Sequence, residues 1–230
     1  MPDPIRVSQV TSSPSRFRAF TVPAGVILAV LTGQACLASP LARENSFIGS
    51  HTCASCHPAQ AKSQLAGNMA KAAFRPRNHP LLERFKNLSA GAPGIRYSLD
   101  IKYDQLVMTV SNGQAVLPIA IDWALGAGVN AVTFISAAEG NRYLEHRVSY
   151  YSDTGRLDFT PGRSKLNFQS LAEAAGHYNE SAEAFRCLAC HTTGTRMDSA
   201  GRLTIGEPGV RCEACPVSYT HLTLPTIYSV

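Results

Sequence analysis

The apolar pattern over residues 57–88 predicts two helices. Leu65 and Met69 lie four positions apart, which places both side chains on one helix face, and Pro58 suits a first helical turn. A second, shorter helix is expected over residues 79–88, the stretch HPLLERFKNL. The following SAGAPG, rich in small residues, predicts a break.

From residue 95 to about residue 159 the pattern changes to short runs of branched and aromatic residues. The turn signals SNG, AEGN and SDTG separate these runs. Runs such as LVMTV and YLEHRVSYY alternate between apolar and polar positions, which indicates strands with one buried face. We therefore expect an antiparallel meander of roughly five or six strands.

Helical signals return after TPGRSK, because SLAEAAGHYNESAEAFRCLACH predicts two short helices. The expected fold class is therefore α+β, with short helices and loops around an inserted antiparallel β-rich segment. The 230 residues, 45% hydrophobic and 16% charged, suit one or two globular domains and argue against a disordered or wholly membrane-embedded protein.

The start of the chain has the order of a secretory signal. Arg16 and Arg18 precede an apolar run over residues 20–31, and small residues follow over residues 35–42, which predicts cleavage after Ala38. The apolar run is short for a bilayer span, so no membrane span is expected once the signal is removed; an uncleaved anchor is the alternative.

Cysteine usage is strongly local. Of seven cysteines, one lies in the predicted signal, and the other six form three Cys-x-x-Cys pairs: Cys53 and Cys56, Cys187 and Cys190, Cys212 and Cys215. Exported proteins ordinarily use cysteine for disulfides between distant residues. Pairs this close together point instead to covalent haem attachment or to a metal site.

The first two pairs carry the signature of c-type haem attachment, because His57 and His191 follow them directly. Thiols at this spacing reach the two vinyl groups on one edge of a porphyrin. The adjacent His then lies under the ring, where its imidazole can bind the iron. We therefore expect His57 and His191 to be proximal ligands.

The third pair is followed by Pro216, not by His. Cys187, Cys190, Cys212 and Cys215 also approach the spacing of a four-cysteine zinc ribbon, so a zinc-binding module is a rival interpretation. Zinc does not require a His directly after each pair, and export disfavours a thiolate zinc site. Haem is therefore the favoured interpretation.

At these motifs the chain resembles the bacterial multihaem cytochromes c, in particular those related to the tetrahaem cytochrome c of ammonia oxidisers. The resemblance rests on FIGSHTCASCHPAQ, SYYSDTGRLDFTPG, FRCLACHTTG and GVRCEAC. Such proteins have His after the third pair, so the resemblance implies haem c as cofactor, with two haems in the sequence as written and three or more in the native protein.

Pro216, which stands where the resemblance leads us to expect His, is also the first residue of a stretch that is not typical of a natural protein. PVSYTHLTLPT resembles a sequencing adapter translated in frame. Only the first base of the Pro216 codon would then be genomic, and that base, C, also begins the codons for His. On this interpretation the natural protein continues past residue 215. The alternative is a genuine C-terminal edge strand, since VSYTHLTL alternates.

The expected organisation has five segments. They are a signal peptide over 1–38, a first haem-binding segment over 39–94, a β-rich insertion over 95–162, a second and truncated third haem-binding segment over 163–215, and an adapter artefact over 216–230.

Sixth iron ligands are expected among the remaining His and Met residues. His177 is the first candidate because a helical stretch ahead of the second motif would let it fold back on a haem face. Met69 and His51 lie close to the first motif, although Met69 also fits an ordinary core position beside Leu65. Strand alternation places His146 on the same face as Leu144, so we expect His146 to be a core histidine.

The function expected from these motifs is that of an exported, periplasmic multihaem cytochrome that transfers single electrons between haems. Its partners would be redox proteins or quinol-linked donors. A multihaem reductase or oxidase, with one open iron acting on a small nitrogen or sulfur compound, is the alternative. The formal charge of +5 falls to +3 without the signal, and no basic cluster indicates a nucleic-acid partner.

Overall fold

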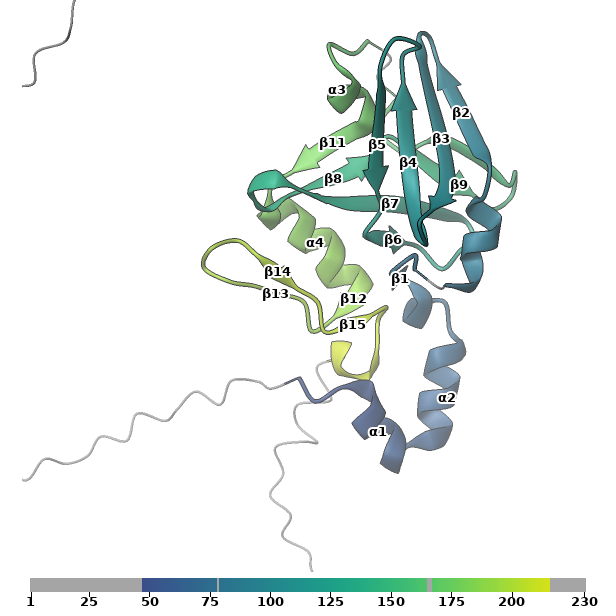
Figure 1. The fold of residues 1–230 in the computed structure, drawn as a ribbon. Helices are drawn as coiled ribbons and strands as arrows, with labels where there is room; N and C mark the ends of the chain where they lie inside the picture. Colours follow the sequence, from purple (N-terminus) through teal and green to yellow (C-terminus); the bar gives the residue numbers. More distant parts are fainter. Residues whose placement is uncertain (1–46, 78, 165–166, 216–230) are drawn as a thin grey trace, which may run out of the picture. The chain divides into compact units, whose positions relative to one another are not determined.

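A computed structural model describes residues 47–215 of the chain, except residues 78, 165 and 166 (Figure 1). These residues all belong to one unit of the chain, Asn45–Val230. The predicted signal peptide and the predicted adapter tail lie outside the described residues.

The helical elements lie mainly at the two ends of this part. The α-helices are α1 (Ser50–Cys56), α2 (Pro58–Ala66), α3 (Leu171–Ala175) and α4 (Ser181–His191), and the 3₁₀ helices are η1 (Met69–Lys71), η2 (Pro80–Phe85), η3 (Glu139–Asn141) and η4 (Cys212–Ala214). The stretch predicted as a second helix thus forms the 3₁₀ helix η2.

The strands come mainly from the middle of the chain. They are β1 (Ala73–Phe74), β2 (Leu88–Ala92), β3 (Ile95–Lys102), β4 (Gln105–Ser111), β5 (Val116–Ala120), β6 (Trp123–Leu125), β7 (Ala131–Ala138), β8 (Arg142–His146), β9 (Val148–Tyr151), β10 (Arg156–Phe159), β11 (Gly176–Asn179), β12 (Thr192–Thr193), β13 (Arg196–Met197), β14 (Leu203–Thr204) and β15 (Glu207–Pro208).

The strands predicted between residues 95 and 159 are divided between two sheets, so the single meander of five or six strands is not formed. In the first sheet, β3, β4 and β5 join β2 in the order β2-β3-β4-β5, all antiparallel. This four-stranded sheet begins at Leu88, and β2 continues into the SAGAPG stretch, residues 89–94, where the sequence indicated a break. Gly94, with a φ of 72°, makes the tight turn that lets β2 pair with β3. The small residues therefore form an edge strand and a turn.

A second sheet joins the β-rich middle to the helical segments on both sides. Among the described residues it has seven strands, in the order β1-β6-β7-β8-β11 with β9 and β10 attached through β7. β1 comes from the segment after α2, and β11 lies between α3 and α4. The β-rich region is therefore hydrogen-bonded to both helical segments.

Two apolar clusters lie on the two sides of this sheet. The larger, between the sheets, is centred on aromatic residues: the Phe85 ring meets Phe134 edge to face at 5.5 Å and Tyr150 at 5.2 Å. On the other side, where Figure 1 shows α4, Leu188 packs against residues that include Ile135. The presence of α-helices together with antiparallel sheets confirms the predicted α+β class.

Candidate functional site

Helix α4 presents the second motif to solvent. Cys187 and Cys190 are exposed, whereas Leu188 between them is 1% exposed and packs on the sheet. Because residues three apart share a helix face, both thiols lie on the side away from the sheet. Both sulfur atoms are therefore accessible for the attachment of one planar group.

His191 is the last residue of α4, and a neighbouring segment fixes its ring. Its Nδ1 lies 2.9 Å from the carbonyl oxygen of Ala72. A carbonyl only accepts, so Nδ1 carries the proton in this contact and Nε2 keeps a lone pair. Ala72 O also accepts from the backbone N–H of Gly126 at 2.7 Å, which anchors the acceptor.

The surroundings of Cys187 keep its thiol protonated. Partial desolvation, together with the nearby Glu145 carboxylate and the Cys190 thiol, raises the pKa of Cys187. Glu145 itself is paired with Arg163, with 2.5 Å between Nη2 and Oε2. The second motif thus lies beside a half-buried ion pair that sequence reasoning did not predict.

The first motif lies on α1 and its C-terminal cap. The N–H of His57 donates to the Cys53 carbonyl at 2.8 Å, which continues the helical bonding up to the predicted ligand. Cys53 is half-buried, whereas Cys56 and His57 are exposed. The first motif therefore resembles the second in being helical with an accessible thiol and imidazole.

The third motif docks on the start of α1 through a residue that sequence reasoning missed. Glu213, between the two cysteines, is 8% exposed, and its carboxylate accepts from the backbone N–H of Ile48 at 3.0 Å and of Gly49 at 2.7 Å. The N–H of Cys212 donates to Ser50 Oγ at 3.3 Å. The first turn of α1 thus gains partners from η4.

Glu207 extends this contact, because it accepts from Ser50 N at 3.0 Å and from Ser50 Oγ at 2.6 Å. Carboxylates commonly stabilise the exposed N–H groups at a helix start. The pattern gave no signal for either Glu because each lies more than 150 residues from α1 in the chain.

The contact between η4 and α1 brings two cysteines of different motifs together. The Cys53 and Cys212 side chains are hydrogen-bonded to each other. Burial, followed by Cys212 and the Glu213 carboxylate, raises the pKa of the Cys53 thiol.

The second motif is tied to the third by the chain that follows it. β12 pairs with β15, Thr193 Oγ1 donates to the Gly209 carbonyl at 2.9 Å, and the Arg211 N–H donates to Thr193 Oγ1 at 2.7 Å. Combined with the His191 to Ala72 contact, these bonds bring all three cysteine motifs into one region of the fold.

His177 lies on strand β11, so its predicted helical setting is wrong. Its register partner is Glu145, which also pairs with Ile135, and Ile135 packs with Leu188 of α4. Since paired residues share a sheet face, His177 lies on the α4 side. It is exposed there, whereas Tyr178 packs on the larger core.

Met69 and His51 are both exposed, Met69 at 64%. Helix α2 ends at Ala66, before Met69, and Leu65 is 45% exposed. The interpretation of Met69 as a core residue on the Leu65 stripe is therefore wrong. An exposed apolar pair beside the first motif fits contact with a bound apolar group.

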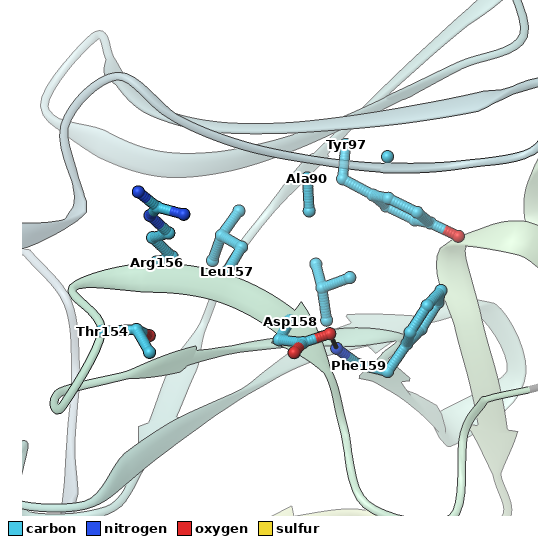
Figure 2. A pocket seen from close by; sticks show the side chains of 9 residues that line it. Ala90, Tyr97, Thr154, Arg156, Leu157, Asp158 and Phe159 are labelled. Atoms are coloured by element: carbon cyan, nitrogen blue, oxygen red, sulfur yellow. Dashed lines mark hydrogen bonds between the residues drawn. The ribbon is translucent and has the colours of Figure 1, made fainter.

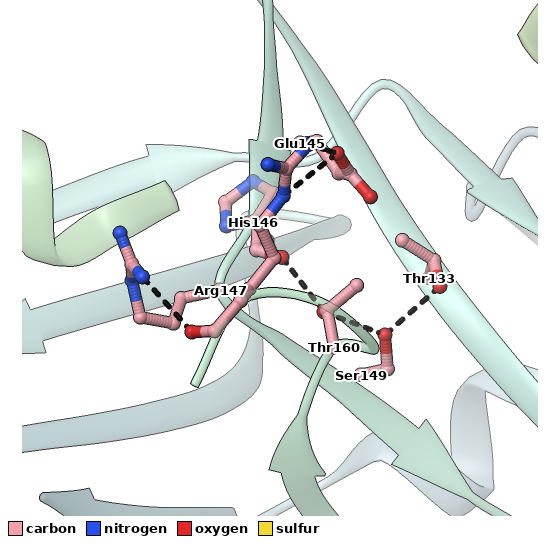
Figure 3. Close-up of polar contacts among 7 residues, drawn as sticks. Thr133, Glu145, His146, Arg147, Ser149 and Thr160 are labelled. Atoms are coloured by element: carbon pink, nitrogen blue, oxygen red, sulfur yellow. Dashed lines mark hydrogen bonds and ion pairs between the residues drawn. The ribbon is translucent and has the colours of Figure 1, made fainter. Parts of the chain in front are cut away.

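His146 is a core histidine, as its alternation predicted. It is fully buried, and its Nε2 lies 2.8 Å from Ser136 Oγ. Its backbone carbonyl accepts from Thr160 Oγ1 at 2.8 Å, which continues into a chain of hydroxyl groups through Ser149 (Figure 3). Burial lowers the pKa of His146 to about 3.

His79 is engaged differently. Its Nδ1 accepts from the Leu81 N–H at 3.3 Å, and its ring stacks on Phe74 at 3.9 Å between centroids. With Nδ1 accepting, the proton of the neutral ring lies on Nε2, so neither nitrogen offers a lone pair to iron in this arrangement.

A pocket of about 340 Å³ lies between β2, β3 and the β9–β10 hairpin (Figure 2). Its lining residues are Ala90, Gly91, Tyr97, Val148, Thr154, Arg156, Leu157, Asp158 and Phe159. None of them is Cys or His, so this pocket is separate from the cysteine motifs.

Within residues 47–215, gaps excepted, no group of three or more His, Cys, Asp or Glu lies close enough to hold a metal ion. The four-cysteine zinc site considered from the sequence spacing is therefore not formed by the described residues. In the same part of the chain, no helix is both long and apolar enough to cross a bilayer.

A family model described as cytochrome c554 and c-prime matches residues 161–216. The match covers the second motif and the third cysteine pair, and it supports a cytochrome c family with covalently bound haem c and haem-based electron transfer. Comparisons with curated proteins and with solved structures gave no significant match.

Proposed function

We propose that this chain is an exported multihaem cytochrome c that carries single electrons. The observation that carries the proposal is the arrangement at the end of α4. Two exposed thiols share one helix side, and Ala72 O holds Nδ1 of the next His so that Nε2 can bind iron. Cys187, Cys190 and His191 lie inside the segment that matches the cytochrome family model.

The residues of the second motif fit the attachment of haem c. Cys187 and Cys190 would form the two thioethers, and His191 would be the proximal ligand. The Ala72 carbonyl would orient the imidazole and increase its basicity, as acceptors behind metal-bound histidines do. When bound, haem c supplies a one-electron iron couple.

The first motif supports a second haem, held by Cys53, Cys56 and His57. The contacts among the three motifs support the multihaem part of the proposal, because they gather the attachment residues of separate segments. The third motif has Pro216 where a ligand is needed, so we propose two haems for the sequence as written, and three or more in a native protein with His there.

Export to the periplasm follows from the predicted signal peptide and from the covalent haem, which is attached to exported chains. The proposed partners are redox proteins or quinol-linked donors. The exposed positions of Cys56, Cys187 and Cys190 support this, since electrons pass most readily where an attached group lies near the surface.

The test is to express the full chain in a host that attaches haem to exported proteins. Intact-mass measurement should show two covalent haems and loss of residues 1–38. Electron paramagnetic resonance of the oxidised protein should show low-spin iron throughout. A high-spin signal would favour the reductase or oxidase alternative, and a colourless product would overturn the proposal.

A further inference from the structure

The hydrogen-bonded pair Cys53 and Cys212 belongs to two different motifs, and this pairing has chemical consequences before any haem is attached. Cys53 lies on α1 and Cys212 begins η4. Both are half-buried, whereas their motif partners Cys56 and Cys215 are exposed. The two inner thiols are hydrogen-bonded to each other, and the two outer thiols are exposed to solvent.

Several bonds fix this geometry around the sulfur atoms. The Cys212 N–H donates to Ser50 Oγ, one helical turn before Cys53. The adjacent Glu213 holds the backbone of Gly49 through its buried carboxylate. Because bonds on both sides of Cys212 hold η4 to the first turn of α1, the effective concentration of one thiol at the other is high.

We propose that Cys53 and Cys212 form a disulfide in the haem-free chain, joining the first motif to the third. The inference does not depend on the proposed function, because the contact is a property of the polypeptide. It adds a modification site at Cys53, where a disulfide and haem attachment exclude each other.

The oxidant is a disulfide, such as that of an exported thiol oxidoreductase. One cysteine thiolate attacks a sulfur of the oxidant, which forms a mixed disulfide and releases one oxidant thiol. The second cysteine thiolate then attacks the protein sulfur of that mixed disulfide, forming the Cys53–Cys212 bond and releasing the second oxidant thiol. Two protein thiols lose two protons and two electrons, and the oxidant disulfide gains them.

This bond would block haem attachment at the first motif, and also at the third motif of a native protein with His at position 216. A thioether forms when a thiol adds across a vinyl group, and a sulfur within a disulfide has no thiol hydrogen to add. If the chain is oxidised first, reduction of this one bond must precede haem attachment at Cys53. The exposed pair Cys187 and Cys190 would stay available throughout.

The test compares two variants of the full chain, purified without haem and incubated with oxidised glutathione. C56S/C215S keeps only the inner thiols of the first and third motifs, and C53S/C212S keeps only the outer ones. After acid quenching and alkylation, trypsin releases residues 44–62 and 212–230 as separate peptides, so mass spectrometry counts the linked fraction.

We expect the inner pair to link at least about tenfold more than the outer pair at equal oxidant concentration, because only the inner thiols are in contact. In concentrated urea the difference should disappear. E213Q in the inner-pair background should reduce linking severalfold, because it weakens the bonds to Ile48 and Gly49. E83Q, which removes only a surface pair with Lys86, should not.

Equal linking of the inner and outer pairs under native conditions would overturn the proposal. So would disulfides confined within single motifs when all six motif cysteines are present. Neither result concerns haem content, so a failure here is distinct from a failure of the cytochrome proposal.

Discussion

Gly209 lies against the carbonyl group of Ala70, so close that a Cβ at position 209 would overlap the carbonyl oxygen. Its φ of +77° is also a conformation that L side chains rarely adopt. Next to it, the Val210 N–H donates to the Met69 carbonyl at 2.9 Å. The chain entering the third motif thus packs directly on the chain leaving the first.

We expect G209A to destabilise the protein by about 2–4 kcal/mol, because the new methyl group must push η1 away in addition to straining the backbone. G113A is the matched control: its φ is +86°, but nothing lies within 4 Å of the added Cβ. It should cost about 1–2 kcal/mol. Urea unfolding of both variants measures the difference, and equal losses would contradict the assigned contact.

H191A should remove the proximal ligand of one haem while leaving both thiols in place. Haem that still attaches at Cys187 and Cys190 should lack its proximal ligand, so one haem should lose its low-spin spectrum. H79A is the control, because His79 Nδ1 is occupied by the Leu81 N–H. An H191A protein with unchanged spectrum and full haem content would exclude His191 as a ligand.

H177A should open one iron to carbon monoxide without loss of haem, because His177 is the first candidate for a sixth ligand. M69L and H51A test the other two candidates in the same way. Carbon monoxide titration of the reduced variants gives the number of open irons. The assignment of His177 fails if H177A binds no more carbon monoxide than the parent protein.

Stability should fall between pH 7 and pH 5 because of His146. Burial lowers its folded pKa to about 3, whereas an exposed His in the unfolded chain titrates near 6.5. Below that value the unfolded chain binds a proton that the folded protein does not, so acid favours unfolding. The expected loss of unfolding free energy over this range is about 2 kcal/mol from this group.

H146Q removes this titration, so its unfolding free energy should change less over the same range by about 2 kcal/mol. Comparing each protein with itself at two pH values cancels any constant loss from the substitution. Urea titrations at pH 7 and pH 5 give the four values. Parallel losses in both proteins would show that His146 is not the group responsible.

The sequence predicted best those features that depend on neighbouring residues. Alternation identified the strands around YLEHRVSYY and the buried position of His146, because a strand side chain follows the face of its second neighbours. The haem motifs are similarly local, since their chemistry requires consecutive residues. Helix α4 with its exposed Cys187 and Cys190 agrees with that expectation.

Features that depend on distant partners were not predictable from the pattern. His177 follows two alanines and Gly176 in a helical context, but hydrogen bonding to β8 makes it part of a strand. Glu213 reads as an ordinary polar residue within a motif, yet it is buried by partners 164 and 165 residues earlier. Local propensity contains no information about either pairing.

The span of the Glu213 contact also sets an order of events in time. At about 5–20 residues per second, the ribosome needs roughly 10–30 s to proceed from Gly49 to Glu213. During that interval α1 lacks the carboxylates that complete its first turn, and Cys53 lacks its neighbour. The first motif is therefore complete before Glu213 and Cys212 are synthesised, and in the exported chain haem and Cys212 compete for the same sulfur of Cys53.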